Sequence, residues 1–351
     1  MSVDDARGVI ARARAAGVFP AAAFEIGGSD RVIAGDALGT LTFAADAPPA
    51  RADTPFDLAS LTKAIATTLV VMALVRDGAL RIDEPVSVLV DEWRGAGREA
   101  VTVRDLLEHA SGLPARLLDA PPDGRREFEH DICATPLEYA PRTRSVYSDL
   151  GFILLGFIAA DRGGAPLDEL FARIAVRFQP DLLTFHLPAE RRRLAAPTRP
   201  MDQDARRGRV FAGEVHDNYA AALGGVAGHA GMFGTAGAVA AFARTWLRSV
   251  RGDASLPPPF DPALARVFTM KTTVPGSSRA LGWDTMLPTS SCGTRMSPAA
   301  FGHVGYTGTS LWIDPERDRY FVLLTNRVFG GGTLEEMRAV RRAFHDALGE
   351  V

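Results

Sequence analysis

The sequence is poor in lysine. Of its 39 basic residues only Lys63 and Lys271 are lysines, and the other 37 are arginines. Arginine supplies a permanent positive charge, whereas lysine can release its proton once burial or a nearby charge lowers its pKa. Each of the two lysines is therefore a candidate for a role that requires a titratable amine.

Cysteine and long apolar runs are also scarce. Cys133 and Cys292 stand far apart and outside any CxxC spacing, which argues against a disulfide framework or a zinc knuckle. No run reaches the ~18 apolar residues that a membrane span needs. The first residues include Asp4 and Asp5, where a signal peptide carries basic residues. As written, the sequence predicts a cytoplasmic protein, or a periplasmic one if a leader has been removed.

The charge pattern gives no sign of a nucleic-acid partner. Net charge is −3, and the arginine runs at 191–193 and 206–209 are typical of solvated loops. The sequence has no GxSxG motif and no P-loop, and the glycines at 225–231 lack the spacing of a dinucleotide fingerprint. We expect a small-molecule substrate without cofactor, nucleic acid or membrane, and the oligomeric state stays open.

Strand patterns stand at both ends of the chain, with helical patterns between them. The predicted strands are at 21–26, 31–34, 39–43, 280–286, 300–303, 310–314 and 320–325. The predicted helices are at 3–16, 60–76, 102–109, 150–160, 167–178, 235–249 and 333–348. This order predicts an α+β fold in which N- and C-terminal helices flank one antiparallel sheet. We expect one domain of two lobes, an α/β lobe of about 1–60 and 270–351 and a helical lobe of about 61–269, with a site between them.

The motif Ser60-Leu61-Thr62-Lys63 carries the chemistry. Positions i and i+3 share one face of a helix, so Ser60 and Lys63 can touch. Ser60 falls at the helix start, where free N–H groups stabilise developing negative charge. A serine becomes nucleophilic when a neighbouring base takes its proton. The alternative, a capping serine followed by a solvent-facing lysine, is disfavoured because lysine is so rare here.

Two further motifs follow this one along the chain. Tyr147-Ser148-Asp149 precedes an apolar helix, and residues 303–308 read His-Val-Gly-Tyr-Thr-Gly. Together with residues 60–63, they resemble the β-lactamase and penicillin-binding-protein superfamily. The resemblance is to its class C-like branch, which includes D-alanyl carboxypeptidases, D-amino-acid peptidases and esterases. The resemblance extends from about residue 20 to the end of the sequence, and it includes the stretches at 106–114 and 224–231.

The resemblance implies a role for each matching residue. Ser60 would be acylated, Lys63 would take or share its proton, and Tyr147 would act with Lys63 as a proton shuttle. The backbone N–H groups of Ser60 and Tyr306 would form the oxyanion hole. The substrate would be contacted by Asp149, His303 and Gly305, the glycine keeping the strand clear for the substrate backbone.

Two positions depart from the family pattern. Asp149 stands where many members have asparagine, and an ionised carboxylate only accepts hydrogen bonds. This favours a substrate that presents donors, or a structural role for Asp149. His303 stands where the family usually has lysine, which removes a fixed positive charge. Both changes move the site away from a penicillin-like pattern.

The predicted function is hydrolysis of a small ester or amide through a Ser60 acyl-enzyme, with D-alanyl peptides as one natural class. The alternatives are a true class C-like β-lactamase, a non-catalytic penicillin-binding or sensor-like protein, and acyl transfer to another alcohol or amine.

Lys271-Thr272-Thr273 lacks the glycine of the family's Lys-Thr-Gly motif, so Lys271 is interpreted as a surface lysine. His216, Asp217 and His229 fit no common zinc spacing, so no metal is expected. Residues 216–218 either border the cleft or form a loop cluster.

Overall fold

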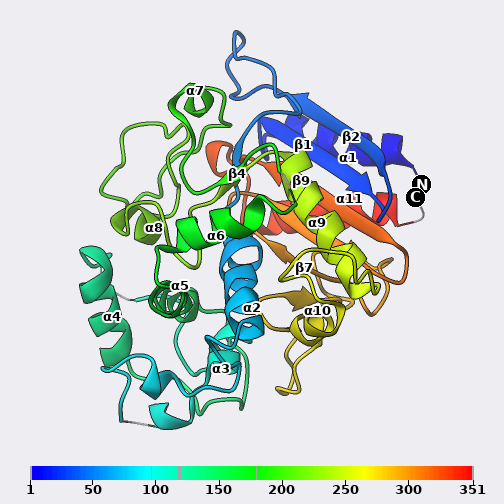
Figure 1. Ribbon diagram of the computed structural model, residues 1–351. Coiled ribbons are helices and arrows are strands. Elements are labelled where there is room, and N and C mark those ends of the chain that lie inside the picture. Colours follow the sequence, from blue (N-terminus) through cyan, green and yellow to red (C-terminus); the bar gives the residue numbers. More distant parts are fainter. Residues whose placement is uncertain (1, 96, 118–119, 179, 350–351) are drawn as a thin grey trace.

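The structure is a computed structural model that describes residues 2–349 except 96, 118, 119 and 179. Its main sheet joins the two ends of the chain, in the strand order β2-β1-β9-β8-β7-β6 (Figure 1). The strands are β1 (Ala21–Gly27), β2 (Val32–Gly39), β6 (Asp284–Thr285), β7 (Phe301–Val304), β8 (Ser310–Asp314) and β9 (Arg319–Thr325). All the pairings are antiparallel, and β1 lies between β2 and β9.

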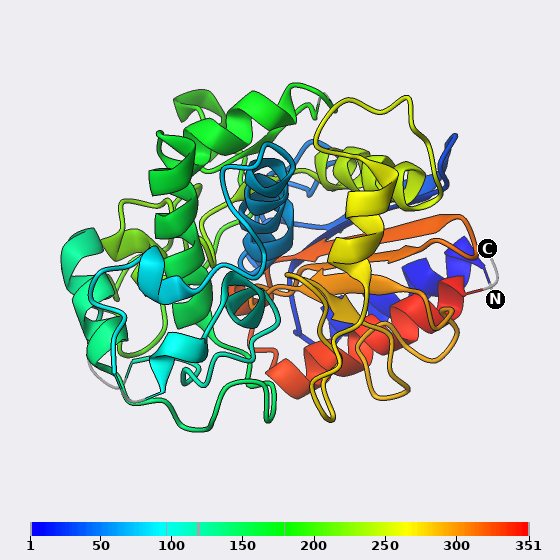
Figure 2. The ribbon, with the colours of Figure 1, turned by 60° about the horizontal axis from the view of Figure 1, so that its bottom comes forward.

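Both faces of this sheet are covered by helices. Successive side chains of a strand point to opposite faces, so Phe24 and Ile26 of β1 pack with α1 (Val3–Ala15) and α11 (Leu334–Leu348). Ala21 and Ala23 face the other core, which contains α9 (Ala236–Val250). Figure 2 shows α11 beneath the sheet. The terminal helices and the sheet therefore form a layered half of the molecule.

The other half is mainly helical and lies beside the sheet (Figure 1). Its helices are α2 (Leu69–Arg76), α3 (Val103–Leu107), α4 (Gly124–Ala134), α5 (Asp149–Gly163), α6 (Leu167–Ala175), α7 (Ala189–Arg192) and α8 (Asn218–Ala222), with α10 (Pro262–Thr269) nearer the sheet. A small sheet joins β3 (Phe56–Asp57), β5 (Phe233–Gly234) and β4 (Leu183–Thr184). Short 3₁₀ turns occur at Val86–Val88, Arg98–Ala100 and Arg327–Phe329. No described helix has, on its own, the length and hydropathy of a membrane span, although the bent pair α5 and α6 together reaches them.

The α+β prediction is confirmed, with several local differences. The strands predicted at 31–34 and 39–43 are one strand, Val32–Gly39, because Gly35 and Asp36 continue the pairing with β1; beyond it Thr40 forms only an isolated bridge. The proposed lobe boundary placed α9 in the helical half. In the structure α9 packs on the sheet, since the rings of Phe242 and Trp246 contact Trp283, and Trp246 also contacts Phe301 of β7.

Candidate active site

Ser60 follows a strained turn that Asp57 holds in place. Ala59 has a φ of 48°, the left-handed region that residues with a side chain rarely adopt. The buried carboxylate of Asp57 accepts hydrogen bonds from the N–H of Ala59 at 2.8 Å and from the N–H of His216 at 2.7 Å. Asp57 therefore fixes the turn that presents Ser60 and ties it to the loop at residue 216.

Asp57 predicts a measurable pH dependence of stability. Burial raises its pKa to about 6, against the opposing effect of its two N–H donors. Between the ordinary carboxyl pKa and 6, the folded protein keeps a proton that the unfolded chain has released. The protonated Asp57 carboxyl therefore contributes to the free energy of unfolding at low pH, and this contribution is lost as pH rises to about 6. We expect the unfolding free energy of the wild type, relative to Asp57→Asn, to fall by about 3 kcal/mol between pH 4 and 7 in urea titrations. A difference that stays constant over this range would contradict the prediction.

The helix after Ser60 is wound unusually at the lysine. A regular helix is predicted from 60 to 76, but Lys63–Thr68 is π-helical, and the α-helix that follows it is Leu69–Arg76. Such π-turns are rare and often occur at functional sites. Lys63 is completely buried in this turn. Its Nζ lies 3.0 Å from Ser60 Oγ, 2.7 Å from Asp149 Oδ1 and 3.1 Å from the carbonyl oxygen of His229.

These three contacts determine the charge of Lys63. An ammonium group has three donors, and the three oxygens provide one acceptor for each. Burial alone lowers the pKa of Lys63, but the charge and hydrogen bond of Asp149, with a smaller contribution from Tyr147, outweigh burial, and the pKa is raised. Lys63 is therefore an ammonium group in the resting protein.

Tyr147 lies against Lys63 within a group of rings. The Nζ atom is 4.8 Å from the centre of the Tyr147 ring, and the centre of the His109 ring is 4.6 Å from that of Tyr147. His109 Nδ1 accepts a hydrogen bond from the N–H of Ser148 at 3.0 Å, so it fixes the segment that carries Tyr147. His109 is thus structural, and it lies just beyond the end of α3.

His303 presents a hydrogen-bond acceptor to the site. Its ring centre is 6.0 Å from that of Tyr147. Nδ1 lies 2.9 Å from the carbonyl oxygen of Val304, so Nδ1 carries the hydrogen, and within the described chain the buried Nε2 has no hydrogen-bond partner. Burial lowers the pKa of His303 well below its usual value, with help from Lys63 and Arg279. His303 is therefore neutral, unlike the lysine that the family usually has here.

Gly305 and Tyr306 complete the wall opposite Ser60. A Cβ at Gly305 would lie 2.1 Å from Thr309 Oγ1 and 2.6 Å from the carbonyl oxygen of Leu58. The glycine therefore lets this strand end approach the segment before Ser60, a different reason from the clear path for substrate that the motif suggested. The carbonyl oxygen of Tyr306 accepts two hydrogen bonds from Arg327, at 3.1 and 2.5 Å. Among the described residues, the N–H groups of Ser60 and Tyr306 have no backbone acceptor, so both are available to a ligand.

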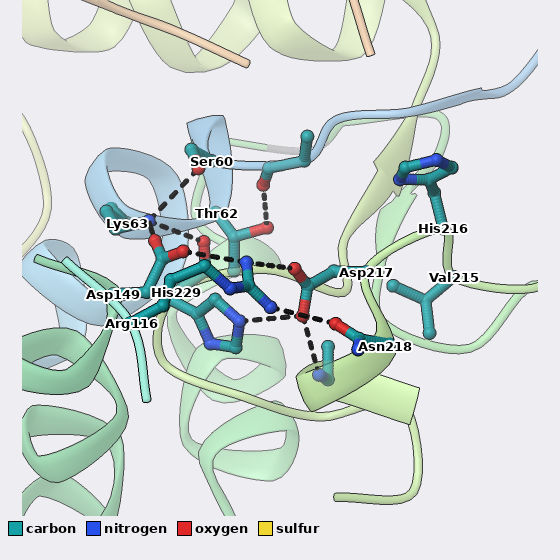
Figure 3. A network of polar contacts seen from close by, with 12 residues as sticks. Ser60, Thr62, Lys63, Arg116, Asp149, Val215, His216, Asp217, Asn218 and His229 are labelled. Carbon is teal, nitrogen blue, oxygen red and sulfur yellow. Dashed lines mark hydrogen bonds and ion pairs between the residues drawn. The ribbon is translucent and has the colours of Figure 1, made fainter. Parts of the chain in front are cut away.

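Behind Lys63 lies a cluster of charged side chains (Figure 3). Arg116 donates to Asp149 Oδ2 and to Asp217 Oδ2, both at 3.0 Å, and to Asn218 Oδ1 at 2.8 Å. His229 Nε2 lies 2.8 Å from Asp217 Oδ1, which also accepts from the N–H of Ala220 at the start of α8. Asp149, Asp217 and His229 bring three possible metal ligands within 4.8 Å of one another. All four carboxylate oxygens already have donors, however, and three of them accept from the cations Lys63 and Arg116, so the cluster does not fit a metal ion.

The predicted site residues converge on one pocket of about 800 Å³. Its lining includes Ser60, Tyr147, Asp149, His303, Gly305 and Tyr306. Lys63 lies behind Ser60, while Lys271 is exposed and does not line the pocket. His216, Asp217 and Asn218 do line it, and the ring of His216 stacks on Tyr306 at 5.7 Å. Sequence reasoning missed Arg116 and Arg327, because no local spacing distinguishes them among 37 arginines.

A family model, described as Beta-lactamase, matches residues 6–345. The chain belongs to the β-lactamase family. It is 31% identical over 313 residues to a putative D-alanyl-D-alanine carboxypeptidase of Escherichia coli K12, covering 78% of this chain and 69% of the relative. It is 32% identical over 308 residues to an N-acetylmuramyl-L-alanine amidase of Bacillus subtilis, covering 78% and 68%. The family resemblance drawn from the motifs is thereby confirmed.

Solved structures agree on the fold. EstCE1, a hydrolase with promiscuous acyltransferase activity, superposes with a TM-score of 0.78 at 21% identity, over 98% of this chain and 97% of its own. A class C β-lactamase from Rhodobacter sphaeroides gives 0.76 at 20% identity, over 99% of both chains. At these identities the likeness shows the fold alone. Family membership supports a hydrolase of the β-lactamase type.

Proposed function

We propose that the protein is a serine hydrolase that forms an acyl-enzyme at Ser60 on a small ester or amide. The contact that carries this proposal is the 3.0 Å between Lys63 Nζ and Ser60 Oγ at the floor of the pocket. A solvent-facing lysine would not be completely buried against the serine. The alternative of a capping serine is therefore disfavoured.

The proposed reaction has two halves. Ser60 Oγ attacks the substrate carbonyl carbon, and its proton passes to the Lys63–Tyr147 pair. The carbonyl oxygen becomes an anion that the N–H groups of Ser60 and Tyr306 stabilise. The bond to the leaving group breaks as that group takes the proton. Water then attacks the acyl ester and gives a proton to the same pair. As the ester bond breaks, the pair returns that proton to Ser60 Oγ and the acid is released.

The raised pKa of Lys63 sets a condition on this scheme. As an ammonium ion Lys63 holds Ser60 Oγ by donation, so the pair must first lose a proton to become a base. Activity should therefore rise with pH. Substrate that excludes water from the pocket would strengthen the effect of burial, which favours the neutral amine.

The substrate class follows from the pocket wall and the named relatives. The relatives named above are a putative D-alanyl-D-alanine carboxypeptidase and an N-acetylmuramyl-L-alanine amidase. The neutral His303 gives no fixed charge to a substrate carboxylate, but Arg279 lines the same pocket, with its guanidinium 5.2 Å from the centre of the Tyr147 ring. These features support esters and D-alanyl amides as the proposed substrate class.

Labelling of Ser60 tests the proposal. We expect a fluorophosphonate to add one adduct to the folded protein, located at Ser60 by peptide mass spectrometry, and no adduct to Ser60→Ala. Turnover should then be measured with p-nitrophenyl esters of varied chain length, nitrocefin and D-Ala-D-Ala peptides. An unmodified Ser60 in the folded protein would refute the proposal, and fast turnover of nitrocefin alone would favour a β-lactamase.

A further inference from the structure

Arg116 bridges two carboxylates at the back of the site. One of its nitrogens, Nη1, donates to Oδ2 of both Asp149 and Asp217, while the other terminal nitrogen, Nη2, donates to Asn218. The guanidinium lies 4.0 Å from the centre of the Tyr219 ring, which fixes its plane. The side chain is about one-third exposed, and it lines the pocket. Arg116 is therefore held by three polar partners and one ring.

Asp149 is shared between two cations. Its Oδ1 receives Lys63 Nζ at 2.7 Å and its Oδ2 receives Arg116 at 3.0 Å. Arg116 also neutralises Asp217, so the cluster contains the cations Lys63 and Arg116, two carboxylates, and the titratable imidazole of His229 beside Asp217. Without Arg116, the negative charge of the two carboxylates would be less offset, and a proton on Lys63 would be favoured more strongly.

We propose that Arg116 is a positioning residue for the Lys63–Tyr147 pair: it holds Asp149 in place and limits how strongly the two carboxylates favour a proton on that pair. This inference rests on the proposed function of Ser60 and Lys63. Within the described part of the chain Arg116 hydrogen-bonds to Asp149 but to neither Ser60 nor Lys63, so it acts through Asp149. Like-charge repulsion between Arg116 and the Lys63 ammonium acts in the same direction.

The other groups around Lys63 do not supply this effect. From its own turn Lys63 faces Ser60, and from the segment before α5 it faces Tyr147. The loop at 229 contributes a carbonyl oxygen, while His109 and His303 have pKa values held well below their usual range, mainly by burial. Asp149 in turn faces Lys63, Arg116, Asp217 and His229. Arg116 is thus the permanent cation that balances Lys63 in the cluster.

The test compares pH profiles of acylation. We expect Arg116→Gln to move the ascending limb of the rate of Ser60 labelling, and of kcat/KM, to higher pH by about one unit, because the pair then loses its proton less readily. Arg116→Lys keeps the charge and should stay within a few tenths of a unit of the wild type. The double variant Arg116→Gln with Asp217→Asn removes one charge of each sign and should return the limb toward the wild-type position.

A matched control exists elsewhere in the chain. Arg125 also joins two carboxylates, Asp161 at 2.8 Å and Glu129 at 3.7 Å, and lies 4.9 Å from the centre of the Phe157 ring, outside the pocket. Arg125→Gln should leave the profile unchanged. An unshifted limb in Arg116→Gln, or a further shift in the double variant, would overturn the inference. Failure of the wild type to label at Ser60 would instead refute the proposed function.

Discussion

Lys63→Met is expected to lower kcat/KM by about a hundred- to ten-thousand-fold, the usual contribution of a positioned general base. Methionine matches the length and apolar stem of lysine, so it fills the buried space but cannot exchange a proton. Asp149 keeps Arg116 as a partner when Lys63 is absent, which limits the structural damage. Rates of p-nitrophenyl ester hydrolysis and of fluorophosphonate labelling provide the measurement.

The chain supplies its own control for this experiment. Lys271 is the second of the two lysines and is exposed. Lys271→Met should therefore keep wild-type rates. If Lys63→Met labelled Ser60 as fast as the wild type, the amine would have no part in activating the serine. A melting temperature close to that of the wild type would ensure that lost activity reflects chemistry.

The short-range parts of the site could be predicted from the sequence. Ser60 and Lys63 are three residues apart at the start of a helix, so their contact follows from the local turn, in which the Lys63 N–H donates to the Ser60 carbonyl oxygen. Tyr147 and Gly305 were found because they belong to motifs whose order resembles a family. The strand pattern likewise predicted the sheet, since alternation records which face is buried. The features of the site that lie within one secondary-structure element or one sequence motif could therefore be predicted.

The long-range parts of the site could not be predicted from the sequence. Asp149 meets Lys63 across 86 residues of sequence, and Arg116 reaches Asp217 across 101, so no spacing indicates either contact. The ion pair changes the expected chemistry, because a lysine that looked suited to a lowered pKa has a raised one. The π-helical turn at Lys63–Thr68 had no signal either, since its apolar residues also fit an ordinary helix. Charge balance and helix winding were decided by tertiary contacts.

Asp149→Asn should be the variant with the largest effect on stability. The substitution restores the residue that many family members have here, but it removes the carboxylate that pairs with a completely buried lysine. Removing one partner of a buried ion pair is strongly destabilising, and we expect a loss of about 3 kcal/mol near neutral pH. The loss should grow as pH falls, because burial without Asp149 lowers the pKa of Lys63 below its value in the unfolded chain. Urea unfolding at pH 6 and pH 9 measures both effects.

The same variant should shift the pH profile of kcat/KM in the opposite direction from Arg116→Gln. Without the Asp149 carboxylate the ammonium form of Lys63 loses its main stabilising charge, so the ascending limb of kcat/KM should move to lower pH. Asp161→Asn is the control, since it breaks an exposed ion pair with Arg125 and should change neither stability nor the profile appreciably. A variant as stable as the wild type, with its limb unmoved, would show that Asp149 does not set the charge of Lys63. A stability loss together with a shift to lower pH would instead mean that the Asp149 carboxylate stabilises Lys63 in its buried position. The same carboxylate would then make proton release from Lys63 harder.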